Sequence, residues 1–112
     1  MTHDSILDLI GDTPVIQLKT FDTGMCELYV KLENLNPGGS IKDRMAFSMI
    51  KAAEDQGKLK PGDTIIEATA GNTGIALAMV GNQRGYKVQL VVPDKMSQEK
   101  IQMLQALSLI HI

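Results

Sequence analysis

Short apolar stretches alternate with segments of helical periodicity along the whole chain. Strands are predicted at "PVIQL" (14–18), "ELYVKLE" (27–33), "TIIEA" (64–68) and "KVQLVV" (87–92). Helices are predicted after Ser40, over "IALAMVGNQRG" (75–85) and after Ser97. Because short loops join these alternating elements, the pattern predicts an α/β fold built on a mainly parallel sheet.

Two of the predicted helices carry further signals. Ser40 and Asp43 have the spacing of a capping box, in which the serine caps the helix and the acid returns a hydrogen bond. Gly57 is expected to end that helix. The segment 75–85 is apolar on nearly all sides, so we expect a buried helix that ends at Gly85 and needs covering layers on most of its faces.

The composition is that of a soluble globular protein, with 44% hydrophobic and 21% charged residues and a formal net charge of −2. Scattered basic residues and only two Tyr and two Phe argue against a nucleic-acid binder. No apolar run approaches the ~18 residues needed to cross a bilayer, and the acidic N-terminus does not resemble a secretory signal, so a cytoplasmic location is expected. Cys26 is the single cysteine, which excludes an internal disulfide, and we expect a small buried side chain there.

The loop "TAGNTG" (69–74) joins the third predicted strand to the buried helix. Ligands of open α/β sheets collect at the carboxyl ends of strands, where such loops lie. The two glycines leave backbone N–H groups accessible to an anion, and Thr69, Asn72 and Thr73 add hydroxyl and amide donors. A carboxylate or a phosphate would suit this loop, although the same residues are also compatible with a plain strand–helix turn.

A second candidate is Lys42 in "NPGGSIKDR" (36–44), just inside the start of the first predicted helix. A helix N-terminus carries partial positive charge and disfavours a protonated ammonium by ~0.3–1 kcal/mol, and burial acts in the same direction. A neutral amine can attack an aldehyde and form an imine, which is how lysine holds pyridoxal phosphate. Taken by itself, Lys42 is also compatible with a solvated surface lysine, which is what most surface lysines are.

The two loops belong to a longer set of motifs, which covers nearly the whole chain from Ile6 to Leu107. The motifs are "LIGDTPVIQL", "VKLENLNPGGSIKDR", "KPGDTIIEATAGNTGIALA" and "VVPDKMSQEKIQMLQAL". In these stretches the chain resembles the N-terminal part of the cysteine synthase and cystathionine β-synthase family, pyridoxal-phosphate enzymes of the tryptophan-synthase-β-like fold. The resemblance implies an α/β fold of type II, with a mainly parallel sheet and helices on both of its faces.

The resemblance also assigns roles, residue by residue. Lys42 looks like the Schiff-base lysine, which holds pyridoxal 5′-phosphate and later moves the Cα proton of the substrate. Asn72 matches the asparagine that hydrogen-bonds the ring hydroxyl of the cofactor. The loop that grips the amino-acid carboxylate corresponds to Thr69, Ala70, Gly71 and Thr73. No metal is implied.

The implied chemistry is β-replacement, with cysteine made from O-acetylserine and sulfide. The enzymatic alternative is cystathionine formation from O-acetylserine or serine plus homocysteine, and Ala70, where the family commonly has serine, leaves the second substrate open. The alternative of another class is a non-catalytic α/β module that binds an anion through "TAGNTG", although such a module has no need of "GGSIKDR" upstream. The resemblance implies a homodimeric parent enzyme with small-molecule substrates, and neither nucleic acid nor a membrane as a partner.

The end of the chain departs from the family pattern. Family members are about twice this length or more, and their phosphate-binding loop and the partner of the pyridine nitrogen lie downstream. We therefore expect residues 1–107 to be the incomplete N-terminal part of the catalytic domain, inactive alone, with helix 75–85 covered by the missing part. Residues 108–112 are interpreted as a non-native tail, because "LSLIHI" is one translation of a transposase-end sequence used in sequencing libraries; an unusual native strand start is the alternative.

Overall fold

A computed structural model describes residues 2–69, 71–107 and 110–111. The α-helices in this part of the chain are α1 (Lys42–Asp55), α2 (Asn72–Gln83) and α3 (Gln98–Ala106). Its strands are β1 (Val15–Leu18), β2 (Leu28–Lys31), β3 (Thr64–Ala68), β4 (Lys87–Val91) and β5 (Ile110–His111). Short 3-10 helices occupy Ile6–Leu9 and Glu33–Leu35.

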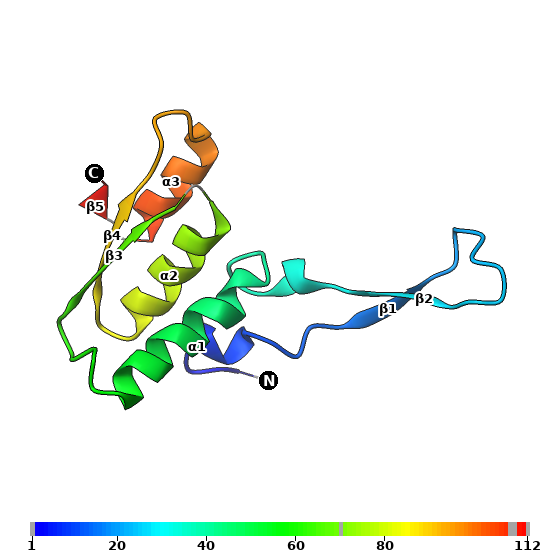
Figure 1. The fold of residues 1–112 in the computed structure, drawn as a ribbon, viewed down its shortest axis with the longest axis horizontal. Coiled ribbons are helices and arrows are strands. Elements are labelled where there is room, and N and C mark those ends of the chain that lie inside the picture. The colour runs from blue at the N-terminus through cyan, green and yellow to red at the C-terminus, as the bar shows by residue number, and fades with distance from the viewer. Residues whose placement is uncertain (1, 70, 108–109, 112) are drawn as a thin grey trace.

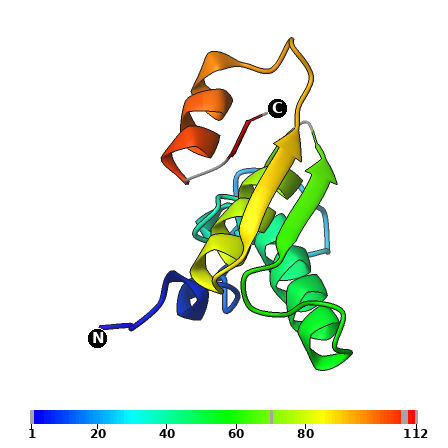
Figure 2. The ribbon, with the colours of Figure 1, turned by 90° about the vertical axis from the view of Figure 1, so that its left-hand side faces the viewer.

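A parallel sheet forms from β3, β4 and β5 in that order, so two strand–helix–strand units follow one another. Both connecting helices pack on the same face, where Val88 and Leu90 of β4 lie against Ile75 of α2 and Leu104 of α3 (Figure 2). The predicted α/β fold with its parallel sheet is therefore confirmed. On the other face Ile66 is 64% exposed, and no helix of the described residues covers it.

The helix α2 is the most enclosed element of the described structure, because every residue from Gly74 to Gly81 is buried. Ala46 and Ile50 of α1 join its apolar side chains in one core cluster, and α3 and the sheet cover its other side (Figure 1). The predicted burial of this helix is confirmed. The expectation that a further part of the protein must cover it is wrong, because elements of this chain already do so.

An antiparallel hairpin of β1 and β2 projects from the helical body as an arm (Figure 1) and accounts for much of the 53 Å length of the molecule. Apolar side chains along the arm are exposed, among them Val15, Phe21 and Met25. Cys26 is exposed as well, so its predicted burial is wrong. A strand pattern shows which residues alternate, but it does not show whether a second layer covers them.

Element ends follow the predicted signals at several positions. Ser97 caps α3 by accepting a hydrogen bond from the N–H of Lys100 at 3.4 Å. Gly57 and Gly85, just beyond the ends of α1 and α2, have φ of +70° and +85°, a conformation that suits glycine. The strand predicted over 27–33 is shorter than expected, because the backbone turns into a 3-10 helix at Glu33.

Candidate functional site

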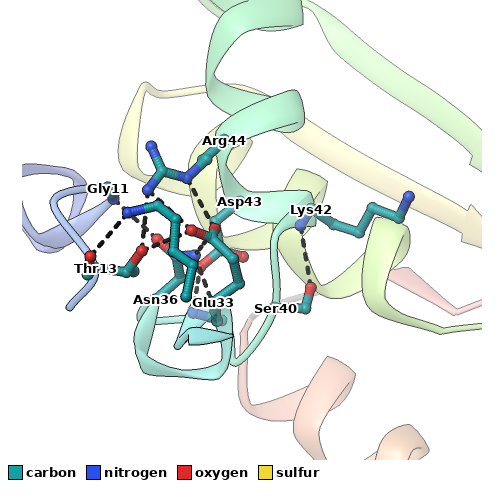
Figure 3. Close-up of polar contacts among 10 residues, drawn as sticks. Gly11, Thr13, Glu33, Asn36, Ser40, Lys42, Asp43 and Arg44 are labelled. Carbon is teal, nitrogen blue, oxygen red and sulfur yellow. Dashed lines mark hydrogen bonds and ion pairs between the residues drawn. The ribbon is translucent and has the colours of Figure 1, made fainter. Parts of the chain in front are cut away.

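The turn that precedes α1 places Lys42 as the first residue of that helix. Gly39, at φ +86°, donates its N–H to the carbonyl of Asn36 at 2.8 Å and reverses the chain. The Ser40 hydroxyl accepts a hydrogen bond from the N–H of Lys42 at 3.2 Å, two residues on (Figure 3). Ser40 therefore satisfies one free N–H group of the helix start, although the N-cap position is Ile41, one residue later than predicted.

Asp43 does not complete the predicted capping box. Its Oδ2 accepts a hydrogen bond from the N–H of Gly38 at 2.5 Å instead of returning to the backbone of Ser40. The turn through Gly38 and Gly39 brings the Gly38 amide over the first turn of α1, where it meets the carboxyl group first. A Cβ at Gly38 would overlap that carboxyl group, so the contact requires glycine.

The Asp43 side chain is fully buried, with 0% of its surface exposed. Its second oxygen, Oδ1, is also buried and has no hydrogen-bond partner within the described part of the chain. Burial raises the pKa of Asp43 above its ordinary value, while the hydrogen bond from Gly38 acts in the opposite direction. Helix-start spacing does not reveal a buried, half-paired carboxyl group of this kind.

Arg44, the next residue, anchors α1 to the base of the hairpin arm. Its guanidinium donates to both carboxylate oxygens of Glu33, at 2.8 and 3.1 Å, and to the Thr13 hydroxyl at 3.2 Å (Figure 3). Thr13 in turn donates to Glu33 at 2.6 Å, and Asn36 donates to the same carboxylate at 2.9 Å. The N–H of Gly11 closes the cluster by donating to the Asn36 side chain at 2.9 Å.

These donors stabilise the charged form of Glu33. The hydrogen bonds from Arg44 and then Thr13 lower the pKa of Glu33 from its ordinary 4.5 to about 2. The cluster contains Thr13 and Asn36, which are both buried, and it joins segments that are far apart in the sequence. We name these four residues, Thr13, Glu33, Asn36 and Arg44, the arm cluster.

Lys42 extends away from the arm cluster and is half-buried (Figure 3). Consecutive helical residues differ in direction by about 100°, so Lys42, Asp43 and Arg44 point to three different surroundings. The packing of α1 on α2 brings the starts of both helices to the same end of the helix pair (Figure 1).

The second loop is fixed by Thr69. Its N–H donates to the carbonyl of Val91 at 3.0 Å, and its hydroxyl accepts from the N–H groups of Gly74 at 3.1 Å and Gly71 at 3.4 Å. The hydroxyl keeps one proton with which it can donate to an anion. A Cβ at Gly74 would overlap the Thr69 side chain. Thr69, which is predicted to bind the substrate carboxylate, therefore also determines how the loop enters α2.

The remaining predicted loop residues lie around the start of α2. Gly71 precedes the helix, Asn72 is its exposed first residue, and Thr73 is half-buried in its first turn. The first N–H groups of any α-helix have no intrahelical acceptor and favour an anion. Ala70 lies outside the described residues.

One pocket of about 330 Å³ brings the two loops together. Gly38 from the turn before Lys42 and Asn72 and Ile75 from the start of α2 form one part of its lining. The other part comes from α3, with Glu99, Lys100 and Met103. The α3 residues were not predicted as site residues, because only the tertiary fold carries this helix beside the loops.

A second pocket, of about 220 Å³, lies between α1 and β3. Its lining is mostly apolar and includes Met49, Ile50, Leu59 and Leu77. It contains none of the predicted site residues.

None of the helices that the structure describes is long and apolar enough to cross a membrane.

The fold and the pocket define a class of protein: an α/β protein with a lysine and a glycine-containing loop at two neighbouring helix starts. The chain belongs to the family described as pyridoxal-phosphate dependent enzyme, whose model matches residues 6–109. The members of this family are enzymes that bind pyridoxal phosphate, so the predicted family and cofactor are confirmed.

Individual relatives agree with this assignment. The chain is 58% identical over 105 residues to a cystathionine beta-synthase of Apis mellifera, with 91% of this chain and 21% of the relative covered. It is 53% identical over 104 residues to a cysteine synthase of Staphylococcus aureus, with 92% and 34% covered. A solved hydrogen sulfide-producing enzyme from Fusobacterium nucleatum superposes with a TM-score of 0.94 at 47% identity, covering 100% of this chain and 37% of that one.

The chain therefore spans about a fifth to a third of the length of the curated relatives it matches. The residues present fit the family cofactor, because the pocket wall at Gly38 has no side chain and Lys42, four residues further on, is the first residue of α1. The start of α2 adds the amide of Asn72 and helix N–H groups that suit an oxyanion.

Proposed function

We propose that this chain is the N-terminal part of a pyridoxal-phosphate enzyme that makes cysteine from O-acetylserine and sulfide by β-replacement. The observation that carries the proposal is the pocket shared by Gly38, next to the lysine turn, and Asn72, at the start of α2. The family membership and the names of the relatives support the general chemistry. The expected homodimeric state and cytoplasmic location belong to this proposal too, as does the non-native origin of residues 108–112.

Each site residue has a separate task in this proposal. Bound pyridoxal phosphate supplies an electron sink for the substrate's Cα–H and β-bonds. Lys42 holds the cofactor covalently through its amine and, once the substrate has displaced it, moves the Cα proton. Asn72 donates its amide to the cofactor ring, and the hydroxyl and N–H groups of Thr69, Gly71 and Thr73 hold the substrate carboxylate. Ala70 belongs to the same loop.

The covalent role of Lys42 can be tested in a completed chain. Residues 1–107 are joined to the part of the Staphylococcus aureus cysteine synthase that follows its matched region, and pyridoxal phosphate is added. After borohydride reduction, peptide mapping is expected to find the cofactor on the peptide that contains Lys42. The Lys42→Arg variant should carry none.

Lys51→Arg provides the matched control, because Lys51 is an exposed lysine on the same helix. This variant should be labelled like the unmodified protein. Labelling at Lys31 or Lys51 in place of Lys42 would contradict the assignment. A non-catalytic module that binds an anion would take up no reducible cofactor at any lysine.

Cystathionine formation is the second candidate, favoured by the 58% identity to the Apis mellifera cystathionine beta-synthase. The two activities differ in the thiol that attacks the substrate after its β-substituent has left. The completed chain is supplied with O-acetylserine together with either sulfide or homocysteine, and the two products are measured. A higher kcat/KM with homocysteine would replace cysteine synthesis by cystathionine synthesis as the function.

A further inference from the structure

We propose that Asp43 is a positioning residue for Lys42, acting through its hydrogen bond to the backbone of Gly38. The inference rests on the proposed function, because it concerns the lysine that would hold the cofactor. It adds a residue that neither touches the cofactor nor belongs to the substrate loop.

The burial of Asp43 calls for an explanation other than stability. Its side chain is 0% exposed, and only one of its two oxygens has a hydrogen-bond donor within the described residues. A buried carboxyl oxygen without a donor is costly, and an apolar side chain of similar size would avoid that cost. What Asp43 provides, and an apolar side chain would not, is an acceptor for the Gly38 amide at 2.5 Å.

The position of Gly38 shows what that acceptor controls. Gly38 lines the 330 Å³ pocket together with Asn72, so its backbone is part of the wall that the cofactor would face. Asp43 lies in the first turn of α1, next to Lys42. The hydrogen bond therefore ties the pocket wall to the helical turn that carries the lysine, and a Cβ at Gly38 would break this fit by overlapping the carboxyl group.

The contact is expected to act on the rate of covalent attachment, because reacting groups must be held close and well aligned. A displacement of about 1 Å, even from a distant mutation, can slow a reaction by roughly a hundredfold. In the completed chain, Asp43→Ala removes the acceptor, and Gly38→Ala disturbs the same contact from its other side. Asp43→Asn keeps an acceptor oxygen and should rescue the function.

The test measures how fast each variant binds pyridoxal phosphate covalently, followed by absorbance, and the circular dichroism of the bound cofactor. Asp43→Ala and Gly38→Ala are expected to attach the cofactor roughly ten- to a hundredfold more slowly and with altered dichroism. Asp43→Asn should stay within about threefold of the unmodified protein, since the acceptor is retained. Asp55→Asn, an exposed aspartate at the other end of α1, is the matched control and should change neither quantity.

Thermal unfolding of the cofactor-free proteins separates positioning from folding. Variants that are less stable but attach the cofactor at the unmodified rate, with unmodified dichroism, would overturn the inference. An Asp43→Asn protein as slow as Asp43→Ala would also overturn it, since the acceptor would then not suffice. If the unmodified protein attaches no cofactor at Lys42, the proposed function fails and this inference fails with it; attachment at equal rates in all variants overturns the inference alone.

Discussion

Three consecutive residues at the start of α1 have different surroundings and different hydrogen-bond partners. Lys42 extends away from the arm cluster, Asp43 bonds the Gly38 amide, and Arg44 binds Glu33 and Thr13. The arm cluster thus lies directly behind the lysine turn. Most of the hydrogen-bond donors in this cluster donate to the Glu33 carboxylate. Protonation of Glu33 is the change that should loosen the cluster.

This leads to a prediction about acid stability. The pKa of Glu33 is about 2 in the folded protein and 4.5 when unperturbed, so the unfolded state binds a proton more readily. Its contribution to stability is fully present above pH 4.5 and is lost as the pH falls towards 2. We expect the unfolding temperature of Glu33→Gln in the completed chain to fall less steeply between pH 5 and pH 2 than that of the unmodified protein.

The control is Glu99→Gln, which removes an exposed carboxyl group outside the arm cluster. Its unfolding temperature should follow the unmodified protein over the same pH range. Some acid dependence will remain in Glu33→Gln, because the ion pair with Arg84 also lowers the pKa of Glu54. Identical slopes for Glu33→Gln and the unmodified protein would show that the arm cluster does not contribute to acid stability.

At the scale of single residues, the sequence predicted which residues form the helix start better than it predicted their hydrogen-bond partners. The prediction that a helix follows Ser40 with Lys42 in its first turn is confirmed, and the Ser40 hydroxyl accepts from the N–H of Lys42, but the N-cap position is Ile41, one residue later than predicted. The partner of Asp43 was wrong, because a capping box assumes a regular entry into the helix and the glycine turn brings another amide closer. Glu33 and Arg44 are 11 residues apart, and no local pattern predicts that they meet.

Among the elements, α2 shows how closely helix and sheet are fitted. Its Gly81 faces the sheet, and a Cβ there would lie 2.6 Å from Cγ2 of Val88 and 3.4 Å from Cδ1 of Ile65. Val88 is buried and has little room to move. The residue next to Gly81 along the helix, Asn82, is exposed.

Replacement by alanine should change the stability of the protein in opposite directions at Gly81 and Asn82. In an open helix, glycine to alanine stabilises by ~1 kcal/mol. At Gly81 the overlap with Val88 adds an overpacking cost of ~1–3 kcal/mol, and we expect Gly81→Ala to be destabilised on balance. Asn82→Ala should be neutral or stabilised by a few tenths of a kcal/mol. Urea unfolding of both variants in the completed chain provides the comparison, and a more stable Gly81→Ala would show that α2 can shift on the sheet.

Element types were more predictable than element surroundings. The apolar pattern over 75–85 correctly indicated a helix that is enclosed from Ile75 to Gly81, whereas residues 82–85 are exposed. The strand at 64–68 has the predicted bounds. The exposure of Cys26 and of the arm was not predictable, because local alternation contains no information about which layer faces a strand. The pocket residues on α3 were missed for the same reason.

As a whole, the described molecule combines an enclosed core with open apolar surfaces. The core of α1, α2, α3 and the sheet is buried, whereas Phe21 and Met25 on the arm and Ile66 on the sheet are well exposed. Exposed apolar patches usually lead to association. The 112 residues alone should therefore fold locally but associate with one another.

The corresponding experiment is to express residues 1–112 alone and add pyridoxal phosphate. Far-UV circular dichroism should show helix, size-exclusion chromatography should show species larger than a monomer, and no cysteine should form from O-acetylserine and sulfide. Lys42 and the loop at 69–73 would supply one wall of the site, which is insufficient to orient the cofactor. Turnover comparable with that of the completed chain, from a monomer, would contradict the proposal that these residues are part of a longer enzyme.

The enclosure of α2 by its own sequence neighbours has a consequence for the order of events during synthesis. Everything that covers this helix in the described structure is encoded within the same stretch of 112 residues. In the longer protein proposed above, every segment that follows this stretch is translated after it, and a following part on the order of 200 residues takes roughly 10–40 s at usual rates. Both helix starts that face the pocket are then already in place, and the nascent chain offers later segments a preformed surface on which to assemble.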